Sequence, residues 1–239
     1  MADRDQLKRA AAEQALDFVE SGMVLGLGTG STAAFFVAAL AARVAKGLAI
    51  VAIPTSERTA AQARQLGVSL TSFAEHRRID VAVDGADEVR RTTLDLIKGR
   101  GGALLREKIV AAASGRFIVI VDHDKLVDRL GQDDGLLPVE VAQFGWQATA
   151  AALEGLGARP ELRRADSGQP FVTDGGNFIL DCRFGAIDDP LETELRINSI
   201  VGVVENGLFV GRSSAVIVAS PDGIDVLTPS GSGQRRKSC

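Results

Sequence analysis

The chain of 239 residues is long enough for one large domain, or for a large domain with a smaller one. Its composition, 46% hydrophobic and 24% charged, is typical of a globular protein with ample apolar material for a packed core. The net charge of −4 argues against general nucleic-acid binding, and no apolar run reaches the roughly 18 residues that span a bilayer, so neither partner is expected.

The cysteines and the two ends of the chain indicate a cellular compartment. Cys182 and Cys239 are too few for a disulfide framework, which favours a reducing environment. The charged N-terminal segment lacks the apolar core of a signal peptide. We therefore expect a cytoplasmic protein, and we expect the final GSGQRRKSC to be a solvated tail rather than a binding arm.

The first 130 residues alternate between helical patterns and short apolar runs. Helices are predicted at 3–20, 31–46, 56–67 and 102–114. Strands are predicted at 23–27, 48–54, 68–73, 79–84, 94–99 and 116–122. Continuously apolar strands that alternate with helices predict an α/β fold, a Rossmann-like and largely parallel sheet with helices on both faces.

The pattern changes after about residue 130. Short strands then alternate with two helices, and Gly175-Gly176 marks a hairpin turn, which predicts a small α+β domain. The apolar run GLFVGRSSAVIVAS is expected to return to the first sheet. The predicted division is a catalytic domain of residues 1–130 and 205–239 with a small domain of residues 131–204.

A glycine-rich loop, LGLGTGST, joins the first predicted strand to an apolar helix. Glycines let the backbone approach a ligand closely, and the amides at a helix N-terminus attract anions. Ser31 and Thr32 add hydroxyl donors, and either one can cap the helix. A tight turn with a capping serine is the simpler interpretation of the same residues.

The glycine loop does not match the nucleotide-binding motifs. A P-loop requires Gly-Lys-Ser/Thr, and no lysine is present here. In a dinucleotide fingerprint an acidic residue would follow the next strand, where this chain has Thr55 and Ser56. A compact phosphate monoester therefore fits the loop better.

Charged residues gather at the ends of two later apolar runs. Asp84 and Asp87 follow one run, Lys98 follows the next, and Glu107 lies in the helix beyond it. A carboxylate can remove a proton beside a carbonyl, and a cation can stabilise the enediolate that forms. Each residue also has a structural interpretation: the aspartates as turn caps, Lys98 as a solvated strand end, and Glu107 paired with a neighbour on an exposed helix face.

Two further observations limit the chemistry. Lys125 follows another apolar run and can reach a phosphate as a point charge. His76 and His123 are not clustered with other ligand residues, so no metal site is expected. Ser56 has no evident base partner, which argues against a serine hydrolase.

The ordered motifs together resemble type A ribose-5-phosphate isomerase over nearly the whole chain. They are LGLGTGSTA, IPTSERT, DGADE, KGRGGALLREK, IVIVDHDKLV, LPVEV and DGGNFILD. The resemblance implies interconversion of ribose 5-phosphate and ribulose 5-phosphate in the non-oxidative pentose phosphate pathway, without metal or cofactor. It also implies a homodimer or a homotetramer.

The resemblance further implies residue roles. Glu107 would be the base that moves the proton between C1 and C2, with Asp84, Asp87 and Lys98 beside it. The substrate site would also include Thr29, Gly30, Ser31, Thr32, Gly85, Ala86, Gly99, Arg100, Gly101 and Lys125. The family's loop commonly reads KGGG, so Arg100 departs from the pattern and either projects into solvent or adds a contact.

Two other functions are consistent with parts of the sequence. A related sugar-phosphate enzyme, such as an amino-sugar-phosphate deaminase or a coenzyme A transferase, shares this kind of fold, but the deaminase would use a histidine that no motif here supplies. A non-catalytic sugar-phosphate sensor usually carries a DNA-binding helical domain, and the first predicted strand already begins near residue 23.

Overall fold

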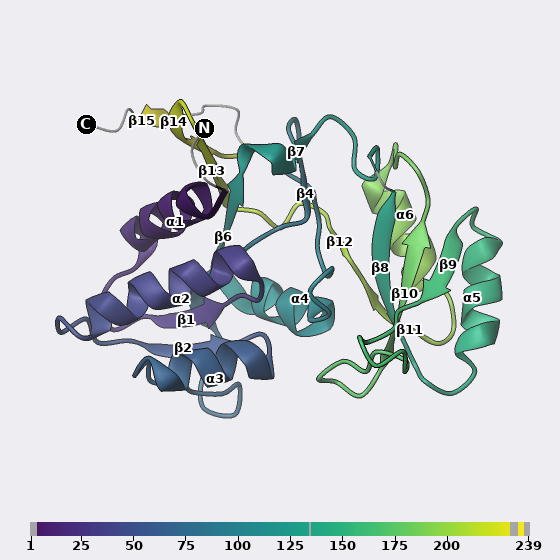
Figure 1. Ribbon diagram of the computed structural model, residues 1–239, viewed down its shortest axis with the longest axis horizontal. Coiled ribbons are helices and arrows are strands. Elements are labelled where there is room, and N and C mark those ends of the chain that lie inside the picture. Colours follow the sequence, from purple (N-terminus) through teal and green to yellow (C-terminus); the bar gives the residue numbers. More distant parts are fainter. Residues whose placement is uncertain (1–3, 134, 230–233, 237–239) are drawn as a thin grey trace. The chain divides into compact units, whose positions relative to one another are not determined.

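The computed structural model describes residues 4–133, 135–229 and 234–236 (Figure 1). The chain forms two compact units and crosses between them after Ala86, Arg106, Lys125 and Gly211. The first unit comprises residues 1–86, 107–125 and 212–239, and the second comprises residues 87–106 and 126–211. Among the described residues, no helix combines the length and the apolar character that a membrane span requires.

The first unit contains a seven-stranded sheet in the order β15-β14-β13-β6-β3-β1-β2. Its strands are β1 (Val24–Leu27), β2 (Val51–Pro54), β3 (Ile79–Asp84), β6 (Ser114–Asp122), β13 (Ala215–Ser220), β14 (Gly223–Leu227) and β15 (Gln234–Arg236). The five strands from β13 to β2 are parallel, and β14 and β15 are antiparallel additions at one edge. The predicted α/β fold with a largely parallel sheet is confirmed.

Helices cover both faces of this sheet. They are α1 (Arg4–Ala15), η1 (Leu16–Phe18), α2 (Ser31–Val44), α3 (Glu57–Gln65), α4 (Leu104–Ala113) and η2 (His123–Lys125). Leu25 and Leu27 join one apolar cluster with residues of α1 and α2, which lie side by side in Figure 1. Because strand side chains alternate between faces, Gly26 faces the other way. A Cβ atom there would lie 2.5 Å from Cγ1 of Val110, so α4 packs on the second face.

The strand order contains a reversal between β1 and β3. From β1 the sheet extends through β2 on one side and through β3 and β6 on the other. In open α/β sheets, ligands bind beyond the carboxyl ends of the strands at such a reversal. The segments that follow β1 and β3 are therefore the place in this unit to look for a ligand.

The second unit contains two four-stranded sheets. The larger is antiparallel, in the order β11-β8-β10-β9, and is accompanied by α5 (Trp146–Glu154) and α6 (Pro190–Asn198). Its strands are β8 (Leu136–Val141), β9 (Arg159–Leu162), β10 (Phe178–Arg183) and β11 (Val203–Asn206). The smaller sheet, β12-β5-β4-β7, joins β4 (Glu88–Arg90), β5 (Leu96–Ile97), β7 (Leu126–Val127) and β12 (Leu208–Phe209).

Several predicted elements differ from the structure. The runs 94–99 and 207–212 were expected on the first sheet, but β5 and β12 pair with each other in the second unit. The segment 68–73 is not a strand, because only Leu70 forms a bridge, to Ala52. Hydropathy reports burial and not the pairing partner, so a short apolar run can join either sheet.

The division of the chain also differs from the predicted boundaries. Residues 87–106, 126–130 and 205–211 were assigned to the larger domain, whereas their contacts place them in the second unit. The reason is the small sheet, whose strands β4, β5, β7 and β12 come from just these segments.

Two smaller predictions have mixed outcomes. The Gly175-Gly176 turn is confirmed, since Gly176 N–H donates to Thr173 O at 2.9 Å and Gly176 has φ +80°. The tail was expected to be solvated rather than a binding arm, and the structure adds that β15 within it pairs with β14. The rest of GSGQRRKSC, including Cys239, lies outside the described residues.

Candidate active site

The glycine loop after β1 leads directly into α2. Gly30 occupies the N-cap position with φ +124°, a conformation that favours glycine, and α2 begins at Ser31. The expectation that Ser31 or Thr32 caps the helix is wrong, because the N-cap is glycine and makes no side-chain bond. Amides in the first turn have no partner within a helix, so a helix start without a side-chain cap suits a bound anion.

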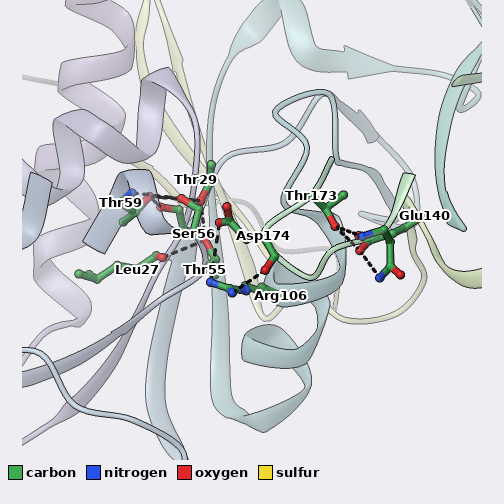
Figure 2. Close-up of polar contacts among 11 residues, drawn as sticks. Leu27, Thr29, Thr55, Ser56, Thr59, Arg106, Glu140, Thr173 and Asp174 are labelled. Carbon is green, nitrogen blue, oxygen red and sulfur yellow. Dashed lines mark hydrogen bonds and ion pairs between the residues drawn. The ribbon is translucent and has the colours of Figure 1, made fainter. Parts of the chain in front are cut away.

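A cluster of buried hydroxyls forms hydrogen bonds with the glycine loop after β1. Figure 2 shows the side chains converging: Thr29 Oγ1 lies 2.7 Å from Thr55 Oγ1, 2.8 Å from Ser56 Oγ and 3.2 Å from Thr59 Oγ1. Thr59 in turn donates to the carbonyl oxygen of Gly28 at 2.9 Å. Ser56 also caps α3 by accepting from Thr59 N–H at 3.1 Å. A role for these TSERT hydroxyls was not predicted, although their spacing at a helix start was a usable signal.

Asp84 connects the end of β3 to the same loop. Its Oδ1 atom accepts hydrogen bonds from Thr29 N–H at 3.0 Å and from Gly85 N–H at 2.7 Å. The side chain is only 2% exposed. A Cβ atom on Gly28 would lie 2.1 Å from Asp84 Oδ1, so this approach requires glycine. The interpretation of Asp84 as a turn-binding carboxylate is thus correct for one of its oxygens.

Glu107 is buried in the first turn of α4, with 3% of its surface exposed. The alternative in which it lies on an exposed helix face is therefore wrong. Its neighbour Arg106 donates to the carbonyl oxygen of Asp174 at 3.0 Å, as Figure 2 shows. Because it is buried, the Glu107 carboxylate has the partial desolvation expected of a base.

Lys125 ends the short helix η2, directly beyond the carboxyl end of β6, and is half-buried. The preceding Asp124 forms an ion pair with Arg4 of α1 at 2.8 Å. Chiefly through this hydrogen bond, Arg4 holds the pKa of Asp124 below its usual value. The pair anchors the turn that carries the lysine.

In the second unit, Asp87 and the loop after β5 form a connected group. Asp87 N–H donates to Ile97 O at 2.9 Å, and Asp87 Oδ2 accepts from Arg100 N–H at 3.0 Å. Lys98 is 2% exposed, and its Nζ lies 5.6 Å from the ring centroid of Phe209. The interpretation of Lys98 as a solvated strand end is therefore wrong.

Arg100 does not simply project into solvent. Its guanidinium lies 3.4 Å from Oε1 of Glu88, whose side chain is 5% exposed. Glu88 also accepts from Gly131 N–H at 2.6 Å. Gly99 needs its φ of +105°, whereas residue 100 has no positive φ, so arginine can stand at this position of the loop.

The structure thus brings some of the predicted site residues into contact in two groups, one in each unit. In the first unit, the segment from Gly28 to Thr32 contacts Asp84 and Gly85. In the second, Asp87 contacts the loop at Arg100.

Metal and thiol chemistry find little support within the part of the chain that the structure describes. Those residues contain no group of three or more His, Cys, Asp or Glu side chains that could hold a metal ion. Cys182 is buried in β10, and burial raises the pKa of its thiol to about 12. Such a thiol stays protonated and is a poor nucleophile at neutral pH.

The fold and the loop at the strand reversal define an α/β protein suited to a small phosphorylated ligand. A family profile, "Ribose 5-phosphate isomerase A (phosphoriboisomerase A)", matches residues 51–223. Ribose-5-phosphate isomerase A of Gloeobacter violaceus is 64% identical over 228 residues, which cover 95% of this chain and 98% of that protein.

Two solved structures give the same result. The ribose 5-phosphate isomerase A of Methanocaldococcus jannaschii superposes with a TM-score of 0.90 at 41% identity and covers 95% of this chain and 100% of its own. A D-ribose-5-phosphate isomerase in complex with phospho-erythronic acid gives a TM-score of 0.91 at 43% identity, over 95% and 99% of the two chains.

The chain belongs to the ribose 5-phosphate isomerase A family. The protein is accordingly an enzyme, and its reaction is the isomerisation of ribose 5-phosphate in the pentose phosphate pathway.

Proposed function

We propose that the protein interconverts D-ribose 5-phosphate and D-ribulose 5-phosphate through an enediolate, with Glu107 as the general base. The base removes a proton from the carbon beside the carbonyl and returns it to the neighbouring carbon. The observation that carries this assignment is the burial of Glu107, 3% exposed in the first turn of α4. The helix fixes the carboxylate, and the exclusion of water keeps it available to the substrate.

The phosphate end of the substrate is assigned to the start of α2 and to Lys125. The uncapped helix start offers amides, Ser31 and Thr32 offer hydroxyls, and Lys125 offers a positive charge. Both donors of Thr29 are engaged inside the protein, its N–H by Asp84 and its hydroxyl by the cluster. We therefore assign Thr29 to shaping the phosphate loop, and we assign contact with the phosphate to Gly30, Ser31 and Thr32.

The sugar end is assigned to the carboxylates and to the second glycine loop. Lys98 supplies the positive charge that stabilises the enediolate oxygens. Asp84 and Asp87 accept hydrogen bonds from the sugar hydroxyls, and both are held by backbone amides. The backbone of 85–86 and 99–101 completes the proposed contacts.

The proposed reaction uses no metal and no cofactor, because an ammonium can stabilise the enediolate instead. Isomerisation measured after exhaustive chelation should proceed at the untreated rate. Loss of activity that a divalent ion restores would contradict this part of the proposal. In D2O, the enediolate route predicts uptake of solvent deuterium at the transferred position, whereas hydride transfer between the carbons predicts none.

We also propose a homodimeric or homotetrameric assembly and a cytoplasmic location. Exposed apolar residues of the second unit support an assembly: Leu191 and Leu195, one turn apart on α6, are 53% and 62% exposed, and Val201 is 94% exposed. Light scattering should give a mass of two or four chains, and Leu195→Asp should lower it. An unchanged monomer mass in both proteins would contradict the assembly.

A further inference from the structure

One arginine of the second unit is bound tightly to a carboxylate of the neighbouring strand. Arg163 follows β9, and its Nε donates to Oδ2 of Asp181 in β10 at 2.8 Å. Its Nη2 contacts the other oxygen of the same carboxylate, so the pair is bidentate. The side chains are only 13% and 19% exposed. A planar guanidinium held at two points has a fixed orientation.

The third nitrogen of this guanidinium, Nη1, donates hydrogen bonds to the glycine loop after β5. Nη1 of Arg163 donates to the carbonyl oxygen of Gly99 at 3.0 Å and to that of Arg100 at 3.1 Å. Phe171 packs beside the guanidinium, with 6.0 Å between its ring centroid and Cζ. A Cβ atom on Gly102 would lie 2.5 Å from the same ring. One side chain thus fixes the loop at two successive peptide units.

Fixing these two carbonyls also fixes the direction of two amides. In a trans peptide the N–H points opposite to the C=O of the same unit, so the N–H groups of Arg100 and Gly101 point away from Arg163. The N–H of Arg100 donates to Asp87. The N–H of Gly101 donates to no residue that the structure describes, and Gly101 is exposed.

We propose that Arg163 and Asp181 are positioning residues, which hold the Gly99–Gly101 backbone so that the Gly101 N–H donates to an oxygen at the sugar end of the substrate. The inference rests on the proposed function, which assigns this loop to the sugar end. A fixed backbone N–H stabilises charge on the enediolate without reorganisation during the reaction. Lysine cannot replace Arg163, because a single ammonium cannot bind one carboxylate in two places and two carbonyls at once.

The test compares two probes that share a phosphate but differ at the other end. Phospho-erythronic acid, the ligand in one related structure, carries a carboxylate and hydroxyls beyond its phosphate. Inorganic phosphate reports the phosphate site alone. Arg163→Lys should lower kcat about 10- to 100-fold and weaken the binding of phospho-erythronic acid about 10-fold, while the affinity for inorganic phosphate changes less than about twofold.

The matched control is Arg183→Lys on the adjacent strand. Arg183 pairs with Glu161 at 3.2 Å between the same two strands, but this pair is exposed. It should change kcat and both affinities less than about twofold. Asp181→Asn keeps the size of the carboxylate and removes its charge, so it carries the same expectation as Arg163→Lys if that variant folds poorly.

Calorimetric titration of both probes reads the positioning role without turnover, so it is independent of whether Glu107 is the base. The proposal is overturned if Arg163→Lys and Asp181→Asn bind phospho-erythronic acid as the unaltered protein does. It is equally overturned if they weaken both probes by the same factor, since the pair would then support the whole unit and not this loop.

Discussion

The two glycine-rich loops of this protein are fixed by different chemistry. In the loop after β1, neutral hydroxyls and the carboxylate of Asp84 hold the backbone, and among the described residues no cationic side chain bonds to Gly28 or Thr29. In the loop after β5, the carbonyls of Gly99 and Arg100 are held by the guanidinium of Arg163.

The difference corresponds to the charge that each loop is proposed to meet. A loop that binds a dianionic phosphate gains from exposed amides, so its internal support can come from hydroxyls and from a carboxylate that accepts from its backbone. A loop that stabilises a transient oxyanion needs one donor in a fixed direction, which a rigid ion pair provides. Variants that remove one kind of support at a time can separate the two, and Glu107 is the residue that both loops are proposed to serve.

The largest effect is expected for Glu107→Gln. Glutamine keeps the shape of the side chain and cannot accept the proton, so kcat should fall about 10²- to 10⁴-fold. Binding of phospho-erythronic acid and the thermal midpoint should change little. Steady-state kinetics with ribose 5-phosphate measures the loss, and a folded variant that keeps more than about a tenth of its turnover would disprove the assignment.

Substitution of Lys98 and of Lys125 should affect different kinetic parameters. Lys98→Ala should lower kcat about 10²-fold, because charge develops on the sugar oxygens only as the proton leaves. Lys125→Ala should mainly raise KM, by about 10-fold, because the phosphate is bound equally in substrate and transition state. The inhibition constant of inorganic phosphate decides the matter: if Lys98→Ala weakens it and Lys125→Ala does not, the two ends of the substrate are assigned the wrong way round.

Breaking the hydroxyl cluster should cost stability as well as affinity. Thr29→Val replaces a hydroxyl that lies within 3.2 Å of three others. It should lower the free energy of unfolding by about 1–3 kcal/mol, since the remaining hydroxyls lose a buried partner. Thr29→Ser keeps the hydroxyl and serves as the control in urea unfolding. Equal stabilities for the two variants would show that the cluster contributes through packing alone.

The smallest effect is expected at the ion pair beside Lys125. Arg4 lowers the pKa of Asp124, so the pair stabilises the fold above the unfolded value near 3.8 and the benefit is lost as the pH falls through the folded value. The pair is exposed, so Asp124→Asn should cost less than about 1 kcal/mol at pH 7. Urea unfolding from pH 6 down to pH 3 should show the difference shrinking, and a difference that grows as the solution becomes acidic would contradict this account.

Much of the fold could be read from local pattern. Continuous apolar runs such as the one from Phe117 to Val121 in β6 predicted a parallel sheet, because only strands buried on both faces are apolar throughout. The glycines before Ser31 predicted a close turn into a helix, which Gly30 provides with φ +124°. The strands β5 and β12 were assigned to the wrong sheet, because two-residue ladders carry too little pattern to specify a partner.

In the candidate site too, some features were predictable from the sequence and others depended on tertiary packing. Sequence motifs alone proposed Asp84, Lys98 and Glu107, since residue type and position after an apolar run are local properties. Their burial, at 2%, 2% and 3% exposed, was decided by tertiary packing and removed the simpler surface interpretations of Lys98 and Glu107.

What the sequence by itself determined is the fold class, the family resemblance and the glycines that permit two unusual backbone turns. These depend on short-range sterics and on hydrophobic periodicity, which neighbouring residues specify. Only the tertiary structure decided what supports the turns. Thr29 meets Thr55 across 26 positions, and Arg163 meets Gly99 across 64, so these contacts exist only after distant segments have packed together.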